Sequence, residues 1–239
     1  TSLSIAAATG LYDLNKKCWI EQFRLYSNIK FPDVITKLNE SYGHIMLGKN
    51  KIPVYACIGD LQSCILSIEM KPYDININLG TGSQVSIISD DNKGLLPEIR
   101  PLYDDKVFST ITHIPCGRAL NLLSKVLDDK NEWFWETFYS PSDNKNSDKV
   151  EIDLNIFPGS YKYNNGGCID KINEQNFDKK ILVDNIKFSL VEQYSDIINK
   201  LILKNNNFKR IIITGGLADK ISDLQNILLD KIHNEVEII

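Results

Sequence analysis

The sequence predicts an α/β protein on the basis of three patterns in its 239 residues. In residues 75–88, apolar and polar residues alternate on both sides of a short glycine turn, which is typical of a β-hairpin. In residues 184–203, apolar residues recur at helical spacing. In residues 210–239, a β-type run, a glycine pair, a helical pattern and a second β-type run predict a βαβ unit. Such a unit implies a right-handed crossover and a site at the carboxyl end of its strand.

The composition indicates a soluble globular protein and argues against several classes of function. With 27 Lys+Arg against 31 Asp+Glu and a net charge of -4, a nucleic-acid-binding surface is not favoured. No stretch approaches the roughly 20 apolar residues of a membrane span. The five cysteines form no C-x-x-C pair and the three histidines are far apart. We therefore expect reduced thiols, a cytoplasmic location and no metal-binding cluster.

Residues 1–72 are predicted to form the first region of the chain. We expect a turn at Thr9-Gly10 and a buried strand that ends at Gly59. The predicted strands are 3–8 and 54–58, and the predicted helices are 19–26 and 61–70.

Residues 73–239 are predicted to form a second domain, because the apolar period changes from 3.6 to 2 near residues 71–73. Stretches rich in Asn and Lys, 143–149 and 204–209, are predicted to be loops. The predicted strands are 75–79, 84–88, 98–103, 106–112, 210–214 and 236–239. The predicted helices are 117–127, 184–203 and a segment carrying Ile221, Leu224, Ile227, Leu228 and Ile232.

Residues 43–50 (GHIMLGKN) approach the phosphate-binding pattern G-x-x-x-x-G-K-[ST], but we reject that interpretation. The last position is Asn50, which lacks the hydroxyl that would hold Mg²⁺. No strand is predicted before the segment, and Pro53 prevents a helix after it.

Three other motifs are ambiguous when each is taken alone. Asp60 follows a predicted strand and Gly59, so it is either a helix N-cap or a carboxylate that accepts a proton from a substrate hydroxyl. The turn at residues 80–82 (GTG) is either an ordinary hairpin turn or a phosphate clamp. The pair Gly215-Gly216 is either a tight turn or a place where the backbone approaches a flat ligand.

The order and spacing of five segments are more informative. They are residues 4–14 (SIAAATGLYDL) followed by Trp19, 53–62 (PVYACIGDLQ), 78–86 (NLGTGSQVS), 113–122 (HIPCGRALNL) and 211–225 (IIITGGLADKISDLQ). Together they resemble the FGGY family of carbohydrate kinases over nearly the whole chain. Within that family, GDLQ followed by NLGTGSQV is most similar to the sedoheptulokinases.

The resemblance implies an actin/hexokinase-like ATPase fold of the ribonuclease H-like type, and it implies roles for individual residues. Asp60 matches the catalytic base, and Gln62 is placed to face the sugar. Thr81 and Gly82 match residues that touch the ATP phosphates. The remaining matches are Gly117 and Asn121 at phosphate and ribose, and Gly215 and Gly216 at the adenine. Lys220 departs from the pattern, because relatives often have Asn a few residues after the glycine pair.

The resemblance also implies the reaction and its limits. We expect ATP-dependent phosphorylation of a ketose or polyol hydroxyl, with sedoheptulose as the first candidate substrate. Mg²⁺ is expected on the phosphates of ATP. Whether the protein forms a homo-oligomer is left open. Residues 1–72 would be the end of domain one, on the sugar and base side, and 73–239 most of domain two, on the nucleotide side. The family's N-terminal Asp-x-Gly-(Thr/Ser) hairpin and its terminal helix have no counterpart here, so we expect a fragment. The alternatives are a nucleotide-binding or inactive kinase-like module, and a kinase for xylulose or glycerol.

Overall fold

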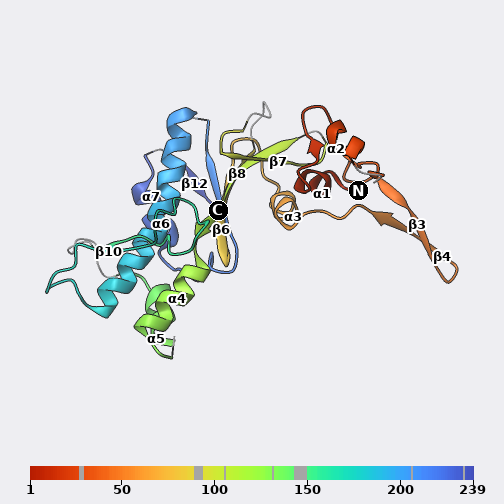
Figure 1. The fold of residues 1–239 in the computed structure, drawn as a ribbon. Helices are drawn as coiled ribbons and strands as arrows, with labels where there is room; N and C mark the ends of the chain where they lie inside the picture. The colour runs from red at the N-terminus through yellow and green to blue at the C-terminus, as the bar shows by residue number, and fades with distance from the viewer. Residues whose placement is uncertain are drawn as a thin grey trace. The chain divides into compact units, whose positions relative to one another are not determined.

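The computed structural model describes residues 1–26, 30–88, 94–104, 106–130, 132–142, 150–205, 207–233 and 235–239. The predicted loop 143–149 lies outside the described residues, and so does Asn206 in the predicted loop 204–209. The chain divides into two compact units, which are drawn in Figure 1. Unit 1 comprises Thr1–Pro72 and Ile88–Ser109, and unit 2 comprises Tyr73–Ile87 and Thr110–Ile239. Residues 88–109, which the sequence pattern places in the second region, therefore group with unit 1.

Unit 1 begins with a helix where the sequence analysis predicts a strand. Helix α1 (Leu3–Ala8) is capped by Ser2, whose hydroxyl accepts a hydrogen bond from the Ile5 amide at 3.3 Å. Three alanines favour the helical state, because alanine has the highest helix propensity. The prediction of a strand at residues 3–8 is wrong. The segment lacks an apolar stripe at helical spacing, but its small apolar residues and its N-cap Ser2 favour a helix.

A short hairpin and a short helix follow α1. The strands are β1 (Tyr12–Asp13) and β2 (Cys18–Trp19), and the helix is α2 (Glu21–Tyr26). The predicted helix 19–26 is therefore shorter than expected. The indole of Trp19 explains this, because it packs edge-on against Tyr12 at 5.4 Å and donates to the Pro32 carbonyl at 2.9 Å.

The next two strands form an exposed antiparallel hairpin, drawn in orange in Figure 1. They are β3 (Ser41–Leu47) and β4 (Asn50–Tyr55), and every residue of β4 is exposed. The prediction of a buried strand at 54–58 is wrong, because β4 pairs with β3 in a two-stranded sheet and ends at Tyr55. The rejected phosphate pattern at 43–50 falls on this hairpin, with its turn at Gly48-Lys49.

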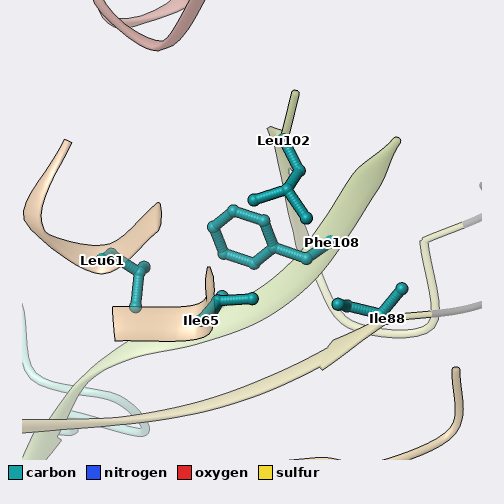
Figure 2. Close-up of a cluster of buried hydrophobic side chains, with 5 residues drawn as sticks. All are labelled: Leu61, Ile65, Ile88, Leu102 and Phe108. Carbon is teal, nitrogen blue, oxygen red and sulfur yellow. The ribbon is translucent and has the colours of Figure 1, made fainter. Parts of the chain in front are cut away.

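Helix α3 (Asp60–Ser67) confirms the helix predicted after Gly59. Its apolar side packs into a cluster with residues that lie later in the chain (Figure 2). Figure 2 shows the Phe108 ring between Leu61 of α3 and the side chains of Leu102 and Ile88. The remaining strand of this unit, β7 (Glu98–Pro101), lies within the predicted strand 98–103.

Unit 2 contains most of a six-stranded mixed sheet. Its strand order is β12 (Glu237–Ile238), β11 (Arg210–Thr214), β5 (Ile75–Leu79), β6 (Gly82–Ile88), β8 (Val107–Pro115) and β7. Strands β11 and β12 are parallel, as are β11 and β5, so the predicted βαβ unit is confirmed. Strands β5 and β6 form the predicted antiparallel hairpin. Strand β5 has neighbours on both edges, and its Asn76 is buried along with its isoleucines.

In the described part of unit 2, four helices accompany the sheet. The longest is α6 (Lys179–Lys204), which Asp178 caps and whose predicted apolar stripe is buried. Helix α6 packs against α5 (Glu132–Tyr139), which the sequence analysis did not predict, and against α7 (Leu224–Lys231) (Figure 1). Helix α4 (Gly117–Leu127) has the predicted bounds. Two short antiparallel strands, β9 (Glu151–Ile152) and β10 (Ile169–Asp170), complete the unit.

The five cysteines are all free thiols. Within the described ranges, no helix combines the length and the apolar character that crossing a membrane requires.

Candidate functional site

The predicted phosphate turn lies at the carboxyl end of β5, where it meets the start of α4. The Gly117 amide donates to the Gly80 carbonyl at 3.1 Å, and the next amide of α4 donates to the Thr81 carbonyl at 2.8 Å. A Cβ atom on Gly117 would lie 2.8 Å from the Gly80 oxygen and 3.2 Å from the Thr81 Cα atom. Real Cβ atoms do not approach a backbone oxygen so closely, so the contact between turn and helix requires glycine at 117.

The predicted glycine pair reaches the same end of β5 from β11. Gly215 has φ +100°, a conformation that side chains rarely adopt, and a Cβ atom there would lie 2.5 Å from the Leu79 oxygen. The Leu217 amide also donates to the Leu79 carbonyl at 3.4 Å. The three glycine-containing segments, which the sequence separates widely, therefore converge around Leu79, Gly80 and Thr81.

A polar network that the sequence analysis did not identify holds the two parallel strands in register. Asn76 donates to the Ile212 carbonyl at 3.0 Å and to the Thr214 hydroxyl at 3.1 Å. Asn78 donates to the same hydroxyl at 3.2 Å, and its carbonyl accepts from Ser83 at 2.6 Å. The signal in the sequence is the pair of asparagines that alternate with the apolar residues of this strand. The network fixes the strand ends from which both turns leave.

Five of the six predicted nucleotide residues are exposed, and Gly117 is half-buried. The exposed residues are Thr81, Gly82, Asn121, Gly215 and Gly216. Asn121 follows Gly117 by one turn of α4, so the two residues share a face of that helix. Apart from Gly216 and its two chain neighbours, no described residue has an atom within 4 Å of the position that a Cβ atom would take on Gly216. The backbone of Gly216 therefore borders open space that a ligand can occupy.

A buried cluster lies behind the turn. Cys116 precedes α4, and its side chain is 1% exposed; burial raises the pKa of its thiol to about 11. Tyr194 of α6 is 1% exposed, and burial raises the pKa of its phenol well above the usual value. Both groups stay neutral at physiological pH, so they support the turn as packing and add no charge to it.

Lys220, the position that departs from the family pattern, lies after the glycine pair. Its ammonium group lies 5.8 Å from the centroid of the Tyr139 ring on α5, a cation–π contact. The structure thus gives Lys220 a partner within unit 2.

The predicted base lies in unit 1. Gly59 is the N-cap residue of α3, and because glycine has no side chain it makes no side-chain capping hydrogen bond. Asp60 is the first helical residue. The carboxylate of Asp60 accepts a hydrogen bond from the Leu61 amide at 2.7 Å, and the residue is exposed. Asp60 is therefore not the N-cap residue itself. Its carboxylate contacts the first turn of α3, and the residue remains exposed.

Gln62, the predicted sugar residue, is 6% exposed. Its side-chain amide donates to the Pro101 carbonyl at 3.3 Å, and its other amide atom lies against Gly59. The bond to Pro101 anchors the first turn of α3 to the end of β7. A contact between Gln62 and a sugar stays a prediction.

In the parts of the chain that the structure describes, no three His, Cys, Asp or Glu side chains are grouped so that they could hold a metal ion.

Comparisons with known proteins identify the fold. No protein-family model matches the chain, and no curated protein matches it. Among solved structures, the chain is similar to xylulose kinase from Rhodospirillum rubrum, with a TM-score of 0.76, 14% identity, and coverage of 100% of this chain and 52% of that one. It is similar to Plasmodium falciparum glycerol kinase with ADP, with a TM-score of 0.76, 18% identity, and coverage of 100% and 51%. Gluconate kinase from Lactobacillus acidophilus gives a TM-score of 0.69 at 16% identity, with coverage of 96% and 50%.

The chain spans about half the length of these solved structures. At such low identity the likeness concerns the arrangement of strands and helices. The chain therefore has the actin/hexokinase-like ATPase fold found in FGGY-type carbohydrate kinases.

Proposed function

We propose that the protein containing this chain is a carbohydrate kinase, which transfers the γ-phosphoryl group of ATP to a hydroxyl of a ketose or polyol. The observation that carries this proposal is the convergence of three glycine-containing segments at the carboxyl end of β5. Backbone that approaches a ligand closely and carries no bulky side chains suits the binding of phosphates and of a flat base. The similarity in fold to xylulose, glycerol and gluconate kinases supports the same proposal.

We assign the nucleotide contacts to unit 2. The exposed backbone of Thr81 and Gly82 would donate to phosphate oxygens. Gly117 and Asn121 would lie at the phosphates and ribose, and the open face at Gly216 would receive the adenine. Gly215 has a different role, because its backbone conformation and its contact with Leu79 set the position of the turn.

We assign the base to unit 1. The accessible carboxylate of Asp60 would accept the proton of the attacking hydroxyl. The hydroxyl oxygen forms a bond to the γ-phosphorus, the bond between that phosphorus and the bridging oxygen breaks, and ADP leaves. Asp60 holds the proton that the hydroxyl loses. Gln62 would fix the helix that carries this carboxylate, through its bond to Pro101.

Mg²⁺ would bind the nucleotide phosphates and would be held largely by water and carboxylates. The ion would neutralise phosphate charge during transfer. We assign no protein ligand to it.

The test is a substrate panel with the full-length protein. Sedoheptulose, xylulose, glycerol and gluconate would be offered with ATP and Mg²⁺, and ADP release would be followed. We expect sugar-dependent ADP release, with sedoheptulose as the preferred substrate. Binding of ADP without ADP release from ATP on any sugar would instead support the nucleotide-binding module without catalysis. Failure to bind ADP at all would overturn both.

A further inference from the structure

We infer that Arg118 binds the polyphosphate of the nucleotide, as a residue additional to those assigned above; this inference rests on the proposed function. Arg118 is the second residue of α4, and its amide donates to the Thr81 carbonyl at 2.8 Å. That bond places the residue directly against the turn proposed to hold the phosphates. The Arg118 side chain is exposed, so a ligand at the turn can reach it.

An aromatic ring holds the guanidinium group of Arg118. Its central carbon lies over the Phe157 ring, 3.8 Å from the ring centroid. When the flat face of a guanidinium lies on a ring, its N–H groups at the edge stay available for an anion. The ring also restricts the side-chain conformations, so less conformational entropy is lost when the anion binds. The loop that carries Phe157 is itself anchored to β8, since the Tyr161 amide donates to the His113 carbonyl at 2.9 Å.

The charge of Arg118 is not used within the described part of the chain. There the Arg118 side chain forms no hydrogen bond and no ion pair, and the contact with Phe157 is its one specific interaction. By contrast, Arg100 pairs with Glu98 and Arg210 pairs with Asp74. An exposed arginine that is oriented by a ring, carries no carboxylate partner and adjoins Thr81 has the properties of an anion-binding residue.

The chemical class of the ligand follows from position. Thr81 lies in the turn that follows β5. Gly216, where the adenine is proposed to bind, follows the adjacent parallel strand β11. The anion nearest Arg118 would therefore be the phosphate chain of a nucleotide and not the nucleoside. Guanidinium groups bind phosphate through two parallel N–H···O bonds, which a lysine cannot reproduce.

The experiment measures binding of ADP, adenosine and inorganic phosphate to the full-length protein by calorimetry. The variants are Arg118→Gln, Arg118→Lys, Phe157→Leu and, as a matched control, Lys125→Gln. Lys125 is an exposed cation in the last turn of the same helix, away from the Thr81 turn. For Arg118→Gln we expect the Kd for ADP to rise about 10- to 100-fold, since hydrogen bonds to charged groups have that strength. Adenosine binding should change less than about twofold, and Lys125→Gln should match the wild type for both ligands.

Two further variants separate binding from structure. Arg118→Lys should recover part of the ADP affinity, because it restores charge without the planar fork. Phe157→Leu should weaken ADP binding less than Arg118→Gln does, and combining the two should add little, because the ring acts through the arginine.

Each remaining outcome overturns the inference. If Arg118→Gln binds ADP within about twofold of the wild type, Arg118 does not contact the phosphates. If it loses ADP and adenosine affinity equally, its role is to support the turn. If inorganic phosphate protects Arg118 from phenylglyoxal modification but ADP does not, the anion is not the nucleotide's. If the wild type binds neither ADP nor adenosine, the proposed function fails as well, whereas normal kinase activity in Arg118→Gln leaves that function intact.

Discussion

At the scale of single residues, Asp60 gives the sharpest test of the proposed chemistry. Asp60→Asn keeps an oxygen that can accept the Leu61 amide, so stability should change by less than about 1 kcal/mol. Proton acceptance is lost, and kcat should therefore fall by roughly 10²–10⁴-fold, with ADP binding largely unchanged. The measurement is kcat and thermal unfolding of the full-length variant.

Asp60→Ala is the control that separates a base from a helix-terminal residue. If Asp60 only stabilises the first turn of α3, the alanine variant loses about 1 kcal/mol of stability and keeps its turnover. Near wild-type turnover in Asp60→Asn would place the base elsewhere.

The two glycines of the pair should respond differently to substitution. Gly216 has open space at its Cβ position, so Gly216→Val should fold normally and raise the KM for ATP by intruding on the adenine. Gly216→Ala should give a smaller rise. Gly215→Ala should lower stability, because its φ of +100° is strained for a side chain and its Cβ atom would collide with the Leu79 carbonyl. Kinetics and thermal unfolding of the three variants check this; an unchanged KM in folded Gly216→Val contradicts the adenine assignment.

Cys116 makes stability depend on pH. Its thiol titrates near 9.0 in the unfolded chain and near 11 in the folded one, because burial disfavours the thiolate. Between these values the folded state holds a proton that the unfolded state has lost, so the free energy of unfolding falls as pH rises from about 9 to about 11. The stability advantage of the wild type over Cys116→Ala should shrink by up to about 1.4 kcal/mol per pH unit in that window. Urea unfolding at pH 8, 9.5 and 11 measures it, and a constant difference would contradict the assignment.

At the scale of elements, the sequence predicts most of unit 2 because its patterns are strong. The β5–β6 hairpin, α4, α6 and β11 were predicted closely, since each shows a clear period and all except α6 border a glycine. Glycine spacing also identified the three segments that converge on β5. Their contacts with Leu79 and Gly80 come from tertiary structure, which local patterns do not encode.

The failures at this scale have local causes. In α1 a run of small residues carries no period, and its N-cap at Ser2 decides the outcome. Residues 54–58 have the composition of a buried strand, but β4 ends at Tyr55 and pairs only in a two-stranded sheet. Helix α5 is rich in aromatic residues, which have modest helix propensity, and forms because Phe134 and Phe138 are buried at helical spacing.

A buried ion pair connects three elements of unit 2. The Lys187 side chain on α6 is 0% exposed, and its ammonium group lies 3.1 Å from the Asp223 carboxylate before α7. It also donates to the Ser140 carbonyl after α5. Asp223→Ala would leave a buried charge without its partner, and we expect a loss of about 3–5 kcal/mol.

The matched control is the exposed pair of Lys162 and Asp196, where Asp196→Ala should cost less than about 1 kcal/mol. Lys187→Met combined with Asp223→Ala should recover much of the stability lost in Asp223→Ala, because no unpaired charge remains. Equal losses for Asp223→Ala and Asp196→Ala in urea unfolding would show that the buried pair is unimportant.

At the scale of the whole molecule, the two units carry different parts of the proposed reaction. The nucleotide candidates all belong to unit 2, and the candidate base belongs to unit 1. Each unit also has its own core: α3 packs with Phe108 in unit 1, and α6 with α5 and α7 in unit 2. Nucleotide binding should therefore tolerate changes in unit 1 that abolish turnover.

This separation predicts how ADP stabilises variants of the full-length protein. A ligand at 100 times its Kd stabilises the folded state by about 2.7 kcal/mol, which raises Tm by several degrees. We expect ADP to raise the Tm of Asp60→Asn as much as that of the wild type, because the nucleotide contacts are intact. The rise should be much smaller in Gly216→Val at the same ADP concentration. If Asp60→Asn loses the ADP-dependent rise, the nucleotide contacts are not confined to unit 2, and the division of roles proposed for the two units is wrong.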